Sequence, residues 1–320
     1  MYIVIAMDWA CRQGKLMNTN TVTKTIFWLS TLIWWVIRIE TNVIYQGECS
    51  KVMKENITDN SIDLTVTSPP YDNLRDYEGY EFNYKPIANE LYRVTKEGGV
   101  VVWVVGDQTI NGSETGNSFR QALYFKGIGF KLHDTMIYRK NGSPFPASKN
   151  DNRYSQIFEY MFVLSKGKPK TTNLICDKEN RWAGYTSFGK SKIRTKEGVL
   201  KERKMKPVPK YSPRNNIWRY NTGKNYTTKD DFAFEHPAMF PEQLAKDHIK
   251  SWSNESDIIF DPMCGSGTTL KQAELLNRKW IGIDMSDKYV NLSYKRLGKV
   301  NKKYYDELPN NEKPKQTQMF

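Results

Sequence analysis

The strongest chemical pattern in the sequence is a glycine-rich turn that lies between two aspartates, Asp261 and Asp284. The stretch from Ile258 to Thr269 reads as a short apolar strand, the turn Gly265-Ser266-Gly267 and the start of a helix, and a second apolar strand follows and ends at Asp284. Glycines let the backbone approach a ligand, and an acid at the tip of the next strand accepts hydrogen bonds from ribose hydroxyls. This segment is therefore predicted to bind an adenosine-containing ligand.

The turn lacks both the complete G-x-G-x-x-G pattern and the lysine of a phosphate-binding loop, which favours a ligand without phosphates. S-adenosylmethionine fits, because Asp261 can face its cationic amino and sulfonium groups while amides and hydroxyls near the helix start hold its carboxylate. One aspartate at a strand end could simply cap a helix, but two that frame one turn favour a cofactor site. The predicted cofactor residues are Asp261, Pro262, Cys264, Gly265, Ser266, Gly267, Thr268, Thr269 and Asp284.

A second motif, Thr67-Ser-Pro-Pro-Tyr71, follows the apolar run from Ile62 to Val66. Pro69 and Pro70 lack a backbone N–H, and each pushes its predecessor toward extended geometry, so the motif cannot continue a helix or lie in a central strand. We interpret it as a stiff exit from a buried strand. An isolated Pro-Pro pair is most often no more than a rigid loop, so a chemical role depends on the rest of the chain.

Positive charge is concentrated in one block of the sequence. The chain of 320 residues has a formal net charge of +13, and residues 166–230 contain 18 Lys or Arg against five Asp or Glu, which equals that whole excess. Aromatic residues lie among these cations, a mixture suited to phosphates and bases, although a soluble lysine-rich insertion is the alternative. The cations predicted to contact nucleic acid are Lys190, Lys192, Arg194, Lys201, Arg203, Lys204, Lys206 and Arg214.

The four cysteines lie far apart, at positions 11, 49, 176 and 264, and the three histidines do not complete a zinc pattern. We therefore expect no metal and no disulfide framework, and a cytoplasmic location. The apolar stretch from Ile26 to Ile37 is too short to span a bilayer and no cleavage site follows it. It is expected to pack on the core or in a homodimer, with contact to a membrane surface as the alternative.

Apolar strand patterns alternate with helix patterns on both sides of the basic block, which predicts an α/β fold with a mostly parallel sheet and helices on both faces. The predicted strands are 61–67, 100–105, 132–139, 157–164, 257–260 and 280–284, and the predicted helices are 86–96, 241–249, 268–277, 286–297 and one capped by Ser118. The basic block has little periodicity and is predicted to lie outside the sheet.

Four motifs in this chain resemble those of the β-class DNA amino-methyltransferases. They are TSPPY (67–71), HPAMFP (236–241), FDPMCGSGTT (260–269) and WIGID (280–284), and the similarity extends to residues 90–99 and 153–167. In that class the SPPY or DPPY motif precedes the target-recognition region and the glycine motif comes last, as it does here. The resemblance implies a seven-stranded Rossmann-like sheet, S-adenosylmethionine as methyl donor and double-stranded DNA as substrate.

The resemblance also implies the organisation of the chain. Residues 41–166 would form the catalytic half of the methyltransferase domain, 167–232 the target-recognition insertion and 233–300 the cofactor-binding half. Residues 1–40 form an extension outside the usual pattern, and residues 301–320 a polar tail. The sequence leaves open whether a restriction endonuclease accompanies the enzyme.

The resemblance assigns catalysis to Ser68, Pro69, Pro70 and Tyr71. An exocyclic amine is a poor nucleophile because its lone pair is delocalised into the ring, so acceptors must draw its hydrogens away. The Pro69 carbonyl and the Ser68 hydroxyl can be those acceptors, and Tyr71 can stack on a base flipped out of the duplex. Serine at position 68, where many adenine enzymes have aspartate, resembles the subgroup that forms N4-methylcytosine; N6-methylation of adenine is the alternative.

Two further residues are assigned to the cofactor site by the resemblance. Phe240 would pack under the methionine end of the donor, while His236 of the same motif is expected to be structural. Glu48 stands where the family usually has an aspartate that lines the cofactor site, and a surface acid at a strand end explains it equally well.

The sequence also allows other classes of function. The basic aromatic block argues against a small-molecule methyltransferase, which has no use for phosphate contacts. The intact SPPY and glycine motifs argue against a nucleic-acid-binding protein without catalytic activity, and an RNA methyltransferase stays open.

Overall fold

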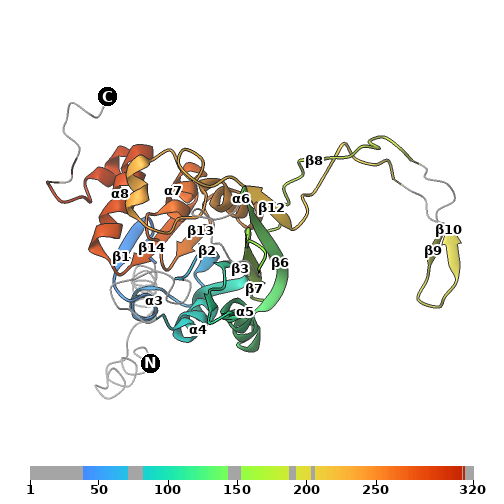
Figure 1. The fold of residues 1–320 in the computed structure, drawn as a ribbon, viewed down its shortest axis with the longest axis horizontal. Coiled ribbons are helices and arrows are strands. Elements are labelled where there is room, and N and C mark those ends of the chain that lie inside the picture. Colours follow the sequence, from blue (N-terminus) through green and yellow to red (C-terminus); the bar gives the residue numbers. More distant parts are fainter. Residues whose placement is uncertain are drawn as a thin grey trace, which may run out of the picture. The chain divides into compact units, whose positions relative to one another are not determined.

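The computed structural model describes residues 39–70, 82–142, 153–186, 192–202, 206–311 and 313. The chain divides into two compact units, residues 1–40 and 41–320, and the second unit contains the helices and strands of the fold. The apolar stretch 26–37 lies outside the described residues. An eight-stranded sheet in the order β1-β14-β13-β2-β3-β7-β6-β12 forms the centre of the second unit (Figure 1).

Five strands pair in parallel, and their apolar β-branched residues are buried on both faces. They are β1 (Val43–Gln46), β14 (Lys279–Asp284), β13 (Ile258–Asp261), β2 (Ile62–Thr67) and β3 (Thr95–Val105). The remaining three strands are β7 (Phe158–Ser165), β6 (Lys131–Lys140) and β12 (Ile217–Tyr220). Strand β7 runs antiparallel to its neighbours β3 and β6, and β12 runs parallel to β6.

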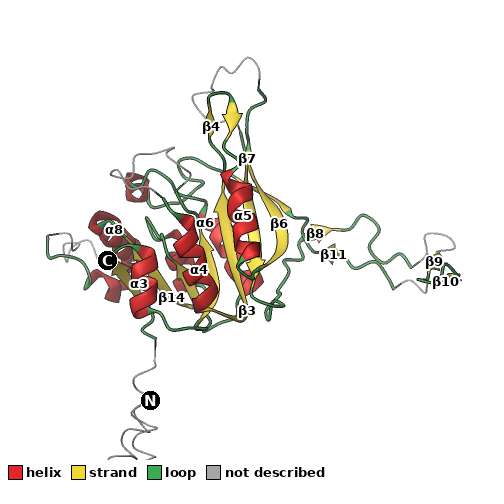
Figure 2. Cartoon of the chain, turned by 90° about the horizontal axis from the view of Figure 1, so that it is seen from below, coloured by secondary structure: helices red, strands yellow, loops and turns green. Residues whose placement is uncertain are grey.

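Helices cover both faces of this sheet (Figure 2). One face carries α3 (Cys49–Asn56), α4 (Tyr84–Val94) and α5 (Asn117–Gly127), and the other carries α6 (Glu242–Trp252), α7 (Thr268–Leu275) and α8 (Asp287–Val300). Helix α4 shows why they pack, since Ile87, Leu91 and Val94 follow helical spacing and are all buried. The predicted α/β class with a mostly parallel, two-sided sheet is confirmed.

Short elements complete the described part of the chain. The hairpins are β4 (Thr109–Ile110) with β5 (Ser113–Glu114), β8 (Lys178–Glu179) with β11 (Tyr211–Ser212), and β9 (Lys192–Arg194) with β10 (Leu200–Glu202). Two 3-10 turns, η1 (Asp231–Glu235) and η2 (Lys302–Tyr305), lie beyond the basic block and after α8.

Two predictions about the sheet are wrong. The sheet has eight strands rather than seven, because residues 217–220 of the basic block form β12, whose Trp218 and Tyr220 are buried against the core. Strand β3 begins at Thr95, five residues before the predicted start at Val100. Gly98 adopts φ +79°, and the register with β2 shifts near this point, so Gly98 lies at an irregularity within the strand.

The predicted cap of α5 is also wrong. The capping position is Gly116, in the left-handed region, and Ser118 lies in the first turn, where its backbone N–H and hydroxyl both donate to Asp107. Within the described ranges, no helix is long and apolar enough to cross a membrane, and no cluster of three potential metal ligands occurs.

Candidate active site

The predicted chemical residues follow neighbouring parallel strands of the sheet. Asp284 ends β14, Asp261 ends β13, and Ser68 comes directly after β2. Because these strands are adjacent and parallel, their carboxyl ends lie at one edge of the sheet, which is where open α/β sheets bind ligands. Two motifs that are about two hundred residues apart in the sequence are thus brought together.

A buried hydrogen bond joins the two motifs directly. The hydroxyl of Thr67, the last residue of β2, donates to Oδ1 of Asp261 at 2.8 Å, and Thr269 Oγ1 donates to the Val66 carbonyl at 3.0 Å. Pro69, the predicted acceptor residue, is buried one residue beyond Ser68, which is partly exposed. Tyr71 lies outside the described residues, so its stacking role stays a prediction.

The glycine-rich turn has the backbone that only glycine adopts without strain. Gly265 and Gly267 have φ values of +51° and +73°, and a Cβ on Gly265 would lie 2.6 Å from His236 Nε2. The turn is closed by the Gly267 N–H, which donates to the Cys264 carbonyl at 2.7 Å, and Gly265 N–H donates to Asp284 Oδ2 at 2.8 Å. The sequence therefore determines the shape of this turn before any ligand arrives.

The two aspartates give the site its electrostatic character. Asp261 is 2% exposed, and burial raises the pKa of its carboxyl to about 7 against the opposing hydrogen bonds from Thr67 and Met263. Burial also raises the pKa of Asp284. No ion pair to either carboxylate occurs among the described residues. A cationic ligand would therefore offset the free energy that burial of these carboxylates costs. The residues present fit the sulfonium and ammonium groups of S-adenosylmethionine.

The other predicted cofactor residues are buried or partly buried. Pro262, Cys264, Ser266, Thr268 and Thr269 are all buried, and Phe240 is partly buried against the core. Ser293 of α8, which the sequence did not single out, donates to the Gly265 carbonyl at 2.8 Å.

His236 packs against the glycine-rich turn. Its ring lies edge-on to Tyr289 at 4.5 Å between centroids, and its Nδ1 accepts the Ala238 N–H at 3.2 Å. Together with the close approach of its ring to Gly265, these contacts account for His236 as a packing residue of the glycine-rich turn.

Glu48 caps helix α3. Its carboxylate accepts the backbone N–H groups of Ser50 and Lys51, both at 2.9 Å, and the Ser50 hydroxyl at 2.7 Å. Partial burial tends to raise the pKa of Glu48, but these hydrogen bonds outweigh it and the pKa is lowered. A role as cofactor ligand stays a prediction beside this capping role.

The two roles of Glu48 have different experimental consequences. We expect Glu48→Ala to reduce the free energy of unfolding by about 1 kcal/mol, the usual effect of removing a cap. The dissociation constant of the donor should stay within about twofold, because an alanine here leaves the aspartates and the glycine turn in place. Urea denaturation and calorimetry measure the two effects separately, and a large loss of donor affinity would assign Glu48 to the cofactor site.

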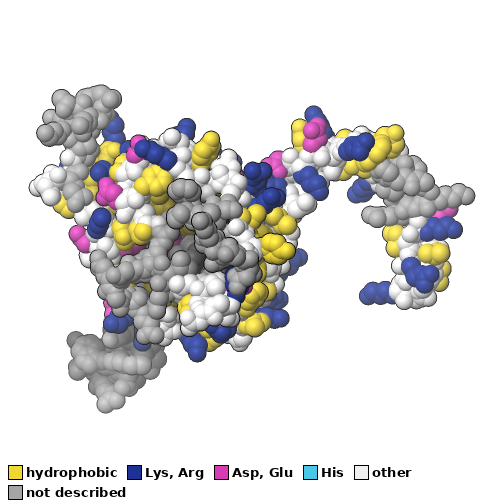
Figure 3. Space-filling model, in the orientation of Figure 1, with side chains coloured by type: hydrophobic (Ala, Val, Ile, Leu, Met, Phe, Trp, Pro, Cys, Tyr) yellow, Lys and Arg dark blue, Asp and Glu magenta, His cyan; other side chains and the backbone are white. Residues whose placement is uncertain are grey.

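Cationic and hydrophobic side chains lie exposed along the basic block (Figure 3). Lys192 and Arg194 of β9, Lys201 of β10, and Lys206 are exposed, as are Trp182, Tyr185 and Tyr211. Arg181 and Lys210 lie over the rings of Trp182 and Tyr211. Three other predicted contacts, Lys190, Arg203 and Lys204, lie outside the described residues.

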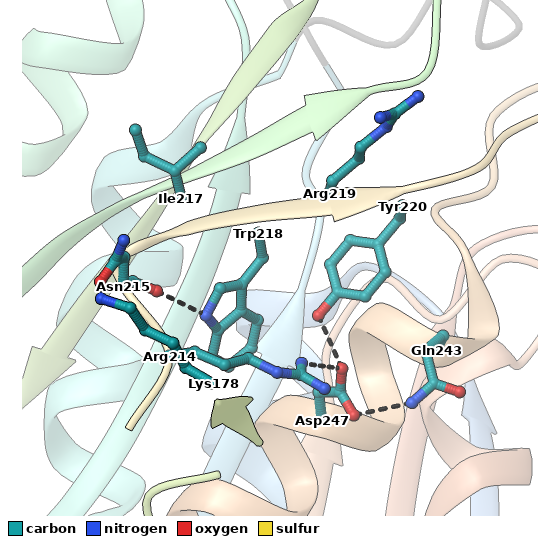
Figure 4. A pocket seen from close by; sticks show the side chains of 9 residues that line it. All are labelled: Lys178, Arg214, Asn215, Ile217, Trp218, Arg219, Tyr220, Gln243 and Asp247. Atoms are coloured by element: carbon teal, nitrogen blue, oxygen red, sulfur yellow. Dashed lines mark hydrogen bonds and ion pairs between the residues drawn. The ribbon is translucent and has the colours of Figure 1, made fainter. Parts of the chain in front are cut away.

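Arg214, by contrast, is engaged within the protein. Its guanidinium pairs with Asp177 at 2.5 Å and with Asp247 at 2.7 Å, and the hydrogen bonds with Asp177 raise the pKa of the arginine. Asp247 also accepts hydrogen bonds from Tyr220 and Gln243, as Figure 4 shows. A DNA phosphate would have to compete with these two carboxylates for Arg214. Contact of Arg214 with DNA stays a prediction.

Arg214, Tyr220, Gln243 and Asp247 line a cavity of about 470 Å³ beside β12, the last strand of the sheet (Figure 4). Its lining combines cationic, aromatic and amide side chains and shares no residue with the predicted cofactor site. The cavity therefore belongs to the edge of the sheet where the basic block rejoins the core.

Comparison with known proteins agrees with this geometry. The family profile described as DNA methylase matches residues 62–295. The chain is 58% identical over 246 residues to the orphan methyltransferase M.BamHII of Bacillus amyloliquefaciens, across 77% of this chain and 92% of that protein. It is 25% identical over 269 residues to the type II methyltransferase M.BglII of Bacillus subtilis, across 80% and 69% of the two chains.

Solved structures agree in fold. The cytosine-N4-specific PvuII DNA methyltransferase superposes with a TM-score of 0.60 at 21% identity, covering 83% of this chain and 91% of that one. The complex of M1.HpyAVI with SAM gives a TM-score of 0.51 at 20% identity, covering 79% and 98%. With its motifs assembled at one edge of a methyltransferase sheet, the chain belongs to the N6/N4 DNA methylase family and uses S-adenosylmethionine as its cofactor.

Proposed function

We propose that this DNA methyltransferase transfers a methyl group to the exocyclic N4 amine of a cytosine that is flipped out of duplex DNA. The observation that carries the proposal is the position of Ser68-Pro69-Pro70 at the carboxyl end of β2, hydrogen-bonded through Thr67 to the buried Asp261. Serine rather than aspartate at position 68 supports cytosine, and the fold of the cytosine-N4-specific PvuII enzyme is consistent with it.

The residues of the motif have distinct tasks. The Pro69 carbonyl and the Ser68 hydroxyl accept the two hydrogens of the amine, so that its lone pair turns toward the donor. The cofactor supplies an electrophilic methyl group bound to a sulfonium. Transfer of this methyl group would leave the donor as a neutral thioether and would require the amine to release one proton to water, while the rigid prolines keep the two acceptors in place without reorganisation.

Adenine is the second candidate, because the chain is also 25% identical over 280 residues to the DNA adenine methyltransferase YhdJ of Escherichia coli. Incubation with mixed-sequence duplex DNA and methyl-labelled donor, digestion to nucleosides and mass spectrometry separate the two. Label in N4-methylcytosine is the expected result. Label in N6-methyladenine would keep the mechanism and overturn the choice of base. In a parallel incubation with RNA, label in the RNA and none in the DNA would overturn the DNA substrate.

The basic block is proposed to bind the phosphates of the target. We expect replacement of Lys192, Arg194, Lys201 and Lys206 by glutamine to flatten the dependence of DNA affinity on salt. The slope of log K against log salt concentration should fall by about 0.9 for each phosphate that is no longer neutralised, thus about 3 to 4 in all. Fluorescence anisotropy between low and physiological salt measures it.

A matched control for this experiment uses four lysines near the amino ends of the parallel strands, away from the carboxyl ends that carry the predicted site. Lys54, Lys126, Lys131 and Lys279 are exposed near the ends of α3 and α5 and the starts of β6 and β14. Their replacement removes the same charge and should change the slope little. Equal effects of the two sets would place the DNA surface outside the basic block.

A place in a restriction–modification system and a cytoplasmic location complete the proposal. Several relatives are named type II methyltransferases, and the relative from Bacillus amyloliquefaciens is named an orphan. A cognate endonuclease and a homodimer remain predictions to be tested by co-purification and by mass measurement in solution.

A further inference from the structure

Arg296 of α8 lies wholly inside the protein, directly under the glycine-rich turn. It is 0% exposed, and all three nitrogens of its guanidinium donate hydrogen bonds. The acceptors are the Ser266 carbonyl at 2.8 Å, Ser266 Oγ and Thr268 Oγ1 at 3.0 Å, Glu242 Oε1 at 2.6 Å, Asp230 Oδ2 at 3.2 Å and Thr228 Oγ1 at 3.3 Å. One side chain thus joins the turn, the start of α6 and the last residues of the basic block.

The bonds to Ser266 and Thr268 fix the part of the turn that the aspartates do not reach. Asp284 and Ser293 hold Gly265, whereas Arg296 holds the carbonyl of the next residue and the hydroxyl at the first position of α7. The direction of the Ser266 carbonyl sets the plane of the peptide that leads into Gly267, whose φ is +73°. The orientation of the first amides of α7 therefore depends on this guanidinium.

The carboxylates beside Arg296 are paired with other cations as well. Lys271 Nζ lies 2.6 Å from Asp230 and 2.8 Å from Glu242, and Lys299 Nζ lies 3.1 Å from Asp230. Burial is the largest influence on both carboxyl groups and tends to raise the pKa of each. The hydrogen bonds and charges of their neighbours, Lys271 first and Arg296 among them, together outweigh it, so both pKa values are lowered. Loss of Arg296 therefore leaves each acid with another cation, whereas it takes away the guanidinium that holds the Ser266 carbonyl.

We propose that Arg296 is a positioning residue for the methyl donor. It holds the peptide at Ser266 and the first turn of α7 in the conformation that receives the donor, and it does so without contacting the donor itself. The proposal rests on the methyltransferase assignment and is independent of whether cytosine or adenine is the target. A lysine cannot replace it, because an ammonium group carries three donors at one point and cannot reach acceptors on three sides.

The test compares Arg296→Lys with Arg93→Lys in the full-length protein. Arg93 of α4 also bonds two carboxylates, Glu90 and Asp59, and two backbone carbonyls, but it has no bond to the turn. Calorimetry gives the donor dissociation constant, urea denaturation gives stability, and hydrogen–deuterium exchange of the donor-free protein reports on residues 262–270. These last two readouts do not require a loaded enzyme.

We expect Arg296→Lys to raise the donor dissociation constant about tenfold or more and to speed exchange in residues 262–270. Arg93→Lys should lower stability while both of these values stay near those of the wild type. Should Arg296→Lys bind the donor as the wild type does, or should Arg93→Lys weaken binding equally, the proposal is wrong. Arg296→Met, which also removes the charge, is a second variant with the same expected direction. Nucleoside analysis of wild-type product tests the choice of base separately, so the two failures are distinguishable.

Discussion

We expect the affinity for S-adenosylmethionine to fall about tenfold for each pH unit below about 7 and to be nearly constant above it. Asp261 is the reason, because burial raises the pKa of its carboxyl to about 7 in the free protein. A cationic ligand binds to the ionised carboxylate, so below pH 7 binding must first release the proton that Asp261 holds. Calorimetry from pH 5.5 to 8.5, in buffers with different heats of ionisation, measures both the affinity and the proton released.

Replacement of Asp261 by asparagine should remove this pH dependence. The asparagine oxygen can still accept the Thr67 hydroxyl, but it presents no charge to the ligand, so affinity at pH 8 should fall roughly 30- to 1000-fold, about 2–4 kcal/mol. Asp247→Asn is the matched control, since Asp247 is also buried and hydrogen-bonded but lies in the cavity beside β12. An affinity that does not change with pH in the wild type would contradict the assignment of Asp261.

The residues that meet at this site could be predicted because they follow parallel strands. Continuous apolar runs such as Val100–Val105 indicated buried parallel strands, and motifs at the carboxyl ends of such strands share an edge. The hydrogen bond from Thr67 to Asp261 was not predicted, although Thr67 belongs to the TSPPY motif. Spacing along the chain gives the order of the strands in sequence, whereas this contact depends on their order in the sheet.

Strand β12 was missed for a different reason. It has four residues, Ile217 to Tyr220, and only Trp218 and Tyr220 are buried. Such a short alternating pattern inside a basic segment does not differ from a loop with two aromatic residues. Its strand structure comes from pairing with β6 at the edge of the sheet, which no local signal in the sequence reports.

Arg296 illustrates the same limit for a side chain. An arginine on an amphipathic helix usually belongs to the solvated face, and nothing in the residues beside it indicates otherwise. It is buried because acceptors from distant segments surround it, among them Thr228 and Glu242. Burial of such a cation is determined by tertiary structure, so local sequence does not report it.

A buried histidine next to β12 gives the second large effect, a loss of stability in mild acid. His248 is 0% exposed, its ring lies 4.8 Å from that of Trp218, and its Nε2 lies 3.2 Å from Met161 Sδ. Its Nδ1 is buried and has no hydrogen-bond partner in the described part of the chain. Burial lowers the pKa of His248 from 6.5 to about 3, because a charged imidazolium would lose its hydration in this apolar position.

The sign of the effect follows from comparison with the unfolded chain. As the pH falls below 6.5, His248 takes up a proton in the unfolded state but stays neutral in the folded state until about pH 3. The free energy of unfolding therefore decreases across this window, by roughly 2–3 kcal/mol at pH 4.5 from this residue alone. His248→Leu should lose less stability between pH 7 and pH 4.5 than the wild type, as measured by urea denaturation at each pH. A His248→Leu protein with the pH dependence of the wild type would show that the histidine is not the group responsible.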